Sequence, residues 1–140
     1  TISEMMTNKK NICKKGDHGS TFGGNPWCTK TAVEVLNILE EKYKAKKIQN
    51  TICIFQKELE KILKKNKKLF SSKTGVGLML GLKLKEERKL QVLIETCLKN
   101  QVLVLKSGKD IVRFLPALNI SKKEIKLGFK RFQKSLDELK

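Results

Sequence analysis

A run with a two-residue period, from Val76 to Leu84, constrains the fold of this chain more than any other feature. Apolar residues occupy alternate positions of the run: Val76, Leu78, Leu80, Leu82 and Leu84. The positions between them hold Gly77, Met79, Gly81 and Lys83. This alternation predicts one β-strand with a buried face. The two glycines on the second face would let another group lie very close to the backbone.

Segments with helical periodicity lie on both sides of this strand. Residues 27–43 and 51–65 precede it, and residues 86–99 follow it. Their recurring apolar positions are Ala32, Val33, Val35, Leu36, Leu39 and Tyr43, then Ile52, Phe55, Leu59, Ile62 and Leu63, then Leu90, Leu93, Ile94, Cys97 and Leu98. The spacing predicts three helices, and Asn25 or Thr29 is the expected cap of the first.

The C-terminal part of the chain predicts a strand pair and a final helix. Residues 102–105 and 111–115 are short apolar segments joined by a turn at 106–110. Ser121 and Glu124 have the spacing of a capping box at the start of the helix. Its expected buried stripe is Ile125, Phe129, Phe132, Leu136 and Leu139. The order of elements predicts an α+β fold, with a small, mostly antiparallel sheet and helices on one face.

Composition limits the class of protein. The 140 residues are enough for one domain, and no apolar run approaches the roughly 20 residues needed to cross a membrane. Residues 1–15 lack the apolar centre of a secretion signal, which predicts a cytoplasmic protein without a membrane partner. The cysteines are scattered, and there is one histidine. We therefore expect free thiols and no metal site.

The net charge of +17 comes almost entirely from lysine, and Arg88, Arg113 and Arg131 are the only arginines. Nucleic-acid readers rely on arginine forks and stacked aromatic side chains. Here Trp27 and Tyr43 stand isolated in the sequence. We interpret the charge as a solvated lysine surface and expect no nucleic-acid partner. A stand-alone basic nucleic-acid-binding module stays open as an alternative.

A glycine-rich segment, GDHGSTFGGNP at residues 16–26, precedes the first predicted helix. Glycine this dense indicates a backbone that turns sharply or approaches another group closely. The hydroxyls of Ser20 and Thr21 and nearby backbone N–H groups suit a phosphate. The spacing matches neither common phosphate-loop pattern. From the residues alone, a phosphate site and a Ser-Thr pair that caps a turn are both open.

This segment resembles the signature of class III pyridoxal-phosphate-dependent aminotransferases. Residues 75–81 are similar to the glycine-rich strand of that family's small domain, and residues 111–120 to its near-terminal strand with a substrate-binding arginine. The resemblance implies the small C-terminal domain of a fold-type I pyridoxal-phosphate enzyme. It assigns 1–26 to the end of the large cofactor-binding domain, 27–46 to a connecting helix and 47–140 to the small domain.

The resemblance also implies roles for three residues. Thr21, helped by Ser20, would bind the phosphate of a pyridoxal 5'-phosphate held in the opposite subunit of a homodimer. Arg113 would bind the α-carboxylate of the substrate through two parallel hydrogen bonds. Alternation places Arg113 beside Ile111 on what we expect to be an inner strand face, where a charge needs a partner. The alternative is an arginine on an edge strand that faces water.

Within the family, the chain most resembles the members that move the terminal amino group of N-acetylornithine to 2-oxoglutarate in arginine biosynthesis. Members that act on ornithine, succinylornithine or 4-aminobutyrate are the alternatives, and so is a non-catalytic structural relative. No lysine of the chain lies in the family's Schiff-base lysine motif. We therefore expect a segment of a longer aminotransferase that is inactive by itself.

Overall fold

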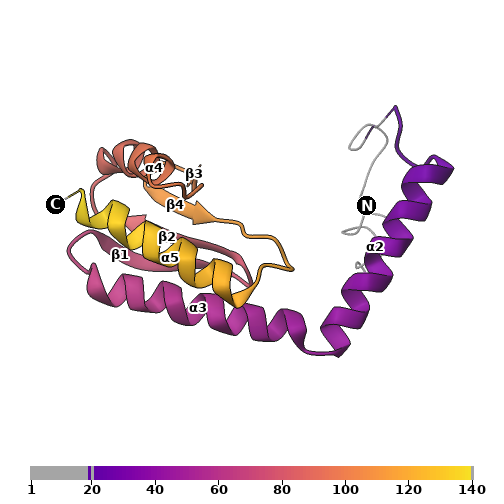
Figure 1. Ribbon diagram of the computed structural model, residues 1–140. Helices are drawn as coiled ribbons and strands as arrows, with labels where there is room; N and C mark the ends of the chain where they lie inside the picture. Colours follow the sequence, from indigo (N-terminus) through magenta and orange to yellow (C-terminus); the bar gives the residue numbers. More distant parts are fainter. Residues whose placement is uncertain (1–18, 20, 140) are drawn as a thin grey trace. The chain divides into compact units, whose positions relative to one another are not determined.

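The structure is a computed structural model that describes residues 19 and 21–139, so Ser20 and most of the first part of the glycine-rich segment lie outside the described residues. The elements in chain order are α2 (Pro26–Lys44), α3 (Lys47–Lys65), β1 (Phe70–Val76), β2 (Met79–Leu84), α4 (Lys89–Lys99), β3 (Leu105–Ser107), β4 (Ile111–Phe114) and α5 (Lys122–Asp137) (Figure 1). The chain folds as two units, residues 1–41 and 42–140.

Helix α2 begins where the sequence predicts, and Asn25 is its cap. The side-chain oxygen of Asn25 accepts a hydrogen bond from the Cys28 N–H at 2.9 Å, and its carbonyl accepts one from the Thr29 N–H at 3.0 Å. Pro26 occupies the first helical position. The N–H that proline lacks would have no partner within the helix there, so no hydrogen bond is lost. No residue of α2 is buried, and Trp27 is 85% exposed. The apolar side of this helix is therefore not covered within its own unit.

The second unit is built on a four-stranded antiparallel sheet in the order β1-β2-β4-β3. Helices α3 and α5 lie side by side across one face of this sheet (Figure 1). All three helices of the unit send apolar side chains into the same core as alternate residues of β2 and β4. The expected α+β architecture, with helices on one face of an antiparallel sheet, is confirmed.

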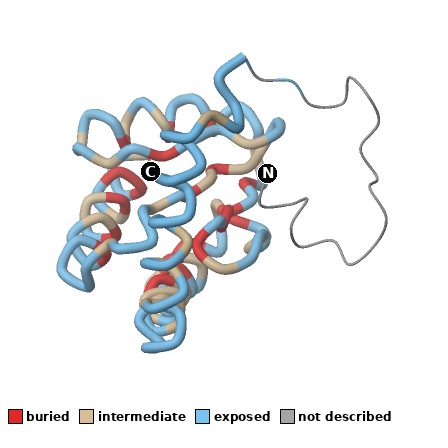
Figure 2. Tube along the Cα trace, turned by 90° about the vertical axis from the view of Figure 1, so that its right-hand side faces the viewer, coloured by how far each residue is buried: buried red, intermediate tan, exposed pale blue. Residues whose placement is uncertain are grey.

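The core explains why the two-residue period is so clear in the sequence. Leu80, Leu82 and Leu84 of β2 are each at most 1% exposed, and Val112 of β4 is fully buried. They meet α5 through the predicted stripe, in which Ile125, Phe129, Phe132 and Leu136 are buried. Buried and exposed stretches alternate along the helices of this unit, as an amphipathic helix requires (Figure 2).

The single strand predicted from Val76 to Leu84 is wrong, because this segment turns at Gly77 and Leu78 into a hairpin. Gly75 and Gly77 have φ angles of +93° and +60°, and a Cβ on Gly75 would stand 2.1 Å from the Met79 carbonyl oxygen. Glycine is needed for this geometry. Strand β1 (FSSKTGV) lies at the sheet edge with little buried surface, so no apolar alternation marks it.

Three other boundaries differ from the sequence prediction. Helix α3 begins at Lys47, and α4 begins at Lys89. The strand predicted at 102–105 lies instead at Leu105–Ser107. The reason is the end of α4, where Gln101 is left-handed with φ +59° and the Val102 N–H bonds back to the Cys97 carbonyl at 2.9 Å. Val102 thus belongs to a helix C-terminal turn.

The capping box of α5 is confirmed in both directions. The Ser121 hydroxyl accepts a hydrogen bond from the Glu124 N–H at 3.2 Å, and the Glu124 carboxylate accepts one from the Ser121 N–H at 2.8 Å. These bonds from Ser121 lower the pKa of Glu124. The helix therefore begins at the position the sequence specifies, which fixes the end of the loop that follows β4.

Candidate substrate-carboxylate and phosphate sites

Arg113 lies in the middle of the sheet, on the face away from the helices. It pairs directly with Gly81 of β2 and with Leu105 of β3. Its neighbours along β4, Val112 and Phe114, are buried in the core, so the side chain of Arg113 projects to the other side. The expectation of an inner, core-side face is therefore wrong. The edge-strand alternative is wrong as well, because β4 lies between β2 and β3.

The guanidinium of Arg113 is half-buried without a partner. Its Nε–H group is buried and donates to no acceptor among the described residues, and no ion pair to Arg113 exists among them. A buried donor left without an acceptor costs roughly 1–3 kcal/mol. An arginine presents its donors as a planar fork that matches a carboxylate. The chemistry of this position therefore suits a ligand with a carboxylate group.

The surface around Arg113, which we call the open face, carries apolar side chains. It includes the outward residues Thr74, Met79, Gly81, Lys83, Leu105, Ile111 and Arg113, and Leu115 follows directly after the end of β4. Met79 is 55% exposed, Leu105 39% and Leu115 54%. Exposed apolar side chains gathered around one half-buried charge are typical of a surface that is covered by another part of a protein or by a ligand.

Thr21 lies in the first unit, in an exposed turn that leads into α2. The turn contains Gly24 with a φ of +78°. The Thr21 hydroxyl makes no hydrogen bond to another residue in the described part of the chain. A hydroxyl in a glycine-rich turn is a donor that a phosphate oxygen can accept from. Thr21 and Arg113 thus lie in different units.

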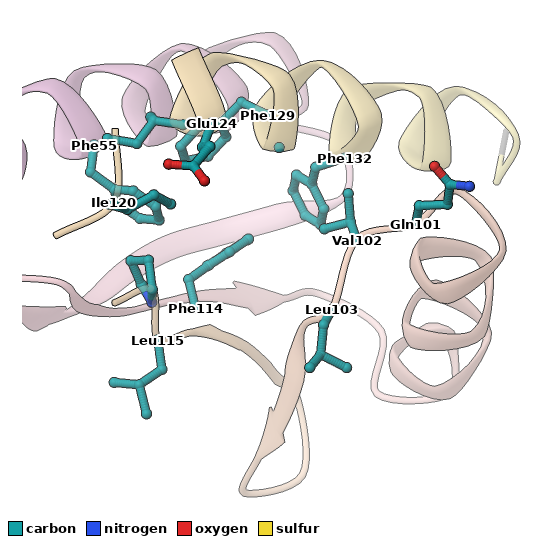
Figure 3. Close-up of a pocket in the computed structure, with 13 residues that line it drawn as sticks. Phe55, Gln101, Val102, Leu103, Phe114, Leu115, Ile120, Glu124, Phe129 and Phe132 are labelled. Carbon is teal, nitrogen blue, oxygen red and sulfur yellow. The ribbon is translucent and has the colours of Figure 1, made fainter. Parts of the chain in front are cut away.

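An apolar pocket of about 270 Å³ lies on the helix-covered side of β4 (Figure 3). The phenyl rings of Phe55, Phe114, Phe129 and Phe132 line it. Phe55 and Phe129 are 4.9 Å apart between ring centroids, and Phe114 meets Phe132 edge-on at 5.0 Å. Glu124, the charged side chain in the lining, is engaged by the α5 cap. The pocket offers mainly apolar contacts, and no positively charged side chain lines it.

One group of lysines lies between α3 and α5. Lys57, Lys64, Lys122 and Lys126 line a hollow of about 520 Å³ there. The carboxylates in the same hollow are already paired, with Glu58 to Lys61 at 2.7 Å and Glu60 to Lys73 at 2.7 Å. Bonding to Lys73 lowers the pKa of Glu60. These are side chains at the solvent boundary, on helix faces that point away from the core.

The thiols of the described residues are free. Cys28 and Cys53 are exposed, and Cys97 is buried in the core. Burial raises the pKa of Cys97 to about 11. Within residues 21–139, no cluster of three or more histidine, cysteine or acidic side chains could hold a metal ion. No helix in the same range is long and apolar enough to cross a membrane.

Comparison with known proteins gives the family. The family model for class-III aminotransferases matches residues 1–136. This chain belongs to the class-III aminotransferases. The match includes both the glycine-rich segment and the strand of Arg113, so the family resemblance described for these segments is confirmed.

Two curated relatives of this class-III aminotransferase chain differ in the substrate that their names state. An acetylornithine aminotransferase of Wolinella succinogenes is 42% identical over 135 residues, which are 96% of this chain and 34% of the relative. A succinylornithine transaminase of Salmonella newport is 35% identical over 142 residues, or 99% of this chain and 35% of the relative. The chain thus spans about a third of the length of the curated relatives it matches.

A solved relative agrees with the fold. The crystal structure of N-acetylornithine aminotransferase from Stenotrophomonas maltophilia matches with a TM-score of 0.73 and 27% identity. The match covers 84% of this chain and 32% of that one. The fold of the chain is therefore that of the corresponding portion of a fold-type I aminotransferase.

Sequence reasoning missed the surroundings of Arg113. It found Arg113 and Ile111 but assigned Thr74 to no element, although Thr74 and Arg113 both pair with Gly81. The sequence signal that Thr74, Gly81 and Arg113 are cross-strand neighbours was weak, because β1 is polar and cross-strand register cannot be read from one strand. The glycine at position 81 was the one available sign of a close approach.

Proposed function

We propose that this chain is the C-terminal portion of a pyridoxal-phosphate-dependent aminotransferase that moves the terminal amino group of N-acetylornithine to 2-oxoglutarate. The half-buried, unpartnered guanidinium of Arg113 carries the proposal. A class-III aminotransferase must hold amino acid and keto acid in turn, and both carry an α-carboxylate. The printed name of the Wolinella succinogenes relative supports acetylornithine as the amino donor.

Arg113 would bind and orient the substrate. The guanidinium forms two parallel charge-assisted hydrogen bonds with the α-carboxylate, which satisfies the buried Nε donor and fixes the direction of the substrate chain. The apolar side chains of Leu105 and Ile111 beside it keep water away from that ion pair.

Thr21, with Ser20, would bind the phosphate of pyridoxal 5'-phosphate held by the opposite subunit of a homodimer. The exposed Thr21 hydroxyl and its glycine-rich turn have the donor chemistry that a phosphate needs. The cofactor, when bound, supplies the electron sink that lets an amino group leave one substrate and enter another. The contribution of this chain is to hold the phosphate and the carboxylate.

The remaining assignments follow from the same proposal. Residues 1–26 would end the large cofactor-binding domain, 27–46 would connect the domains and 47–140 would form the small domain. The lysine that bonds the cofactor covalently would lie outside this chain, so the chain alone would be inactive. The exposed apolar residues of α2 and of the open face support a neighbouring domain. We also propose a cytoplasmic enzyme of arginine biosynthesis.

A second candidate keeps the chemistry and changes the amino donor. The similarity to a succinylornithine transaminase favours succinylornithine as this alternative. Ornithine and 4-aminobutyrate stay open as weaker alternatives. Kinetic constants of the complete enzyme with each donor distinguish these cases, because the correct donor has the highest kcat/KM.

The test of the carboxylate site is Arg113→Lys in the complete enzyme. Lysine keeps the charge and loses the fork, so KM for both the amino donor and 2-oxoglutarate should rise about 10- to 100-fold. Arg131→Lys is the matched control, because Arg131 is a half-buried arginine of α5 whose guanidinium already donates to the Gln101 carbonyl at 3.2 Å. Unchanged KM values for both substrates of the Arg113 variant would contradict the proposal.

A further inference from the structure

Gly81 stands at the centre of a row of residues across the open face. It pairs with Thr74 on β1 and with Arg113 on β4. Directly paired residues of neighbouring strands lie on the same face, with Cβ atoms about 4.5–5.5 Å apart. The size of the residue at position 81 therefore decides how much room the side chains of Thr74 and Arg113 have between them.

Gly81 is buried although it lies on the open face, because neighbouring side chains close over it. A Cβ at this position would lie 2.6 Å from Cγ2 of Ile111 and 2.9 Å from Oγ1 of Thr74. Both distances are shorter than a real Cβ contact. Any side chain at position 81 therefore has to displace Ile111, Thr74 or both.

Ile111 is the neighbour through which such a displacement reaches Arg113. It stands two residues before Arg113 on the same strand and therefore on the same face. A β-branched side chain has few χ1 alternatives, so a side chain at position 81 would push Ile111 toward its neighbours. Arg113 is one of them, and its Nε is already buried. The Nε end of the Arg113 stem is thus enclosed and is not free in solvent.

We infer that Gly81 is a positioning residue for Arg113. Its missing side chain lets Ile111 and Thr74 close on the sheet, and that packing holds the Arg113 guanidinium in the orientation that binds the substrate carboxylate. The inference rests on the proposed function, since it assigns Gly81 to the carboxylate site. It differs from a turn role, because the φ of Gly81 is not positive and its importance comes from the space above it.

Gly81→Ala in the complete enzyme tests this role. We expect KM for the amino donor and for 2-oxoglutarate to rise about 10- to 100-fold, with kcat changed much less, because the guanidinium is misplaced and the chemistry is not. Calorimetric titration with 2-oxoglutarate should show the same loss of affinity. Gly128→Ala is the control, since a Cβ there meets nothing within 4 Å, and its KM values should stay unchanged.

A second substitution separates positioning from general stability. Ile111→Ala alone leaves Gly81 in place and removes the side chain that packs beside Arg113, so both KM values should rise while the amount of folded enzyme is measured beside them. A merely structural Gly81 would lower the amount of folded enzyme without moving KM. If Gly81→Ala does not fold, Ile111→Leu takes its place, because it keeps the volume and removes the Cγ2 branch. This variant should raise both KM values a few-fold.

The outcomes distinguish this inference from the proposed function. The positioning role is overturned if Arg113→Lys raises KM but Gly81→Ala leaves KM unchanged. Where Gly81→Ala does not fold, Ile111→Leu is compared with Arg113→Lys in the same way. The carboxylate site then stands without Gly81. Unchanged KM in Arg113→Lys as well overturns the proposed function itself. Unchanged KM values in a folded Ile111→Ala variant also contradict the inference, because the packing of Ile111 would then not hold Arg113.

Discussion

The two faces of the sheet in the second unit are built from the same strands and differ in almost everything else. The covered face holds Leu80, Leu82 and Val112, which are buried beneath α3, α4 and α5. The open face holds Gly81 and Arg113, which alternate with them along β2 and β4. One face is specified by apolar packing and the other by a charge and a missing side chain. Residues that pack in the core and residues that suit a ligand therefore alternate along the same strands.

The largest effect should come from the covered face. Leu82→Ala removes a fully buried side chain from the centre of the core, and the free energy of unfolding should fall by about 2–5 kcal/mol. Leu105→Ala on the open face is the matched control, because Leu105 is 39% exposed. Denaturant titration of both variants measures the contrast. Equal losses would show that the open face is packed as tightly as the covered one.

Thiol chemistry should distinguish the interior of the second unit from its surface. Cys97 is buried and its pKa is raised to about 11, so at pH 8 its thiolate fraction is far below that of an ordinary cysteine. Alkylation followed by mass spectrometry should label Cys53 about 100-fold faster than Cys97. The unfolded chain, in which the two should react alike, is the control. Equal rates in the folded protein would contradict the burial of Cys97.

The cap of α5 should contribute a smaller part of the stability. Ser121→Ala removes the hydroxyl that accepts the Glu124 N–H, and unfolding should become easier by about 1 kcal/mol. Ser72→Ala, at an exposed position of β1, is the control. Chemical denaturation at neutral pH measures both. A loss in the control as large as that in Ser121→Ala would argue against a specific cap.

The same cap gives a pH dependence with a defined sign. The pKa of Glu124 is lowered from 4.5 by the bonds from Ser121. Its stabilisation is therefore present above pH 4.5 and is lost as the pH falls through the lowered pKa. The difference in unfolding free energy between wild type and Ser121→Ala should shrink across that acidic range. A difference that stays constant to low pH would contradict the paired cap.

The covered face could be predicted well from the sequence, because the periodic spacing of apolar residues marks it directly. The stripe of α5 and the Ser121–Glu124 cap appear in the structure as the sequence predicts. The alternation also gave a wrong strand boundary. Val76 fits the alternation but is 81% exposed, because it lies at the end of β1, across the hairpin turn from β2. Two glycines with positive φ decide that turn. A polar partner strand such as β1 has no periodic signal of its own.

The open face could be predicted only in part. Arg113 was recognised through its resemblance to a family strand, but its face was assigned wrongly. The face of β4 that the helices cover depends on which residues of β4 pair with which residues of β2. This register involves strands that are far apart in the sequence. The role of Gly81 needed the same register, because its clashing neighbours come from β1 and β4.

The central claim is that Arg113 binds the α-carboxylate of the substrate. The most direct measurement compares kcat/KM of the complete enzyme for N-acetylornithine and for its α-carboxamide, in wild type and in Arg113→Met. The account predicts that wild type prefers the acid by about 100-fold or more, since a buried charge pair is worth about 2–5 kcal/mol on truncation. In Arg113→Met this preference should nearly vanish. A preference of the same size in both proteins would contradict the assignment.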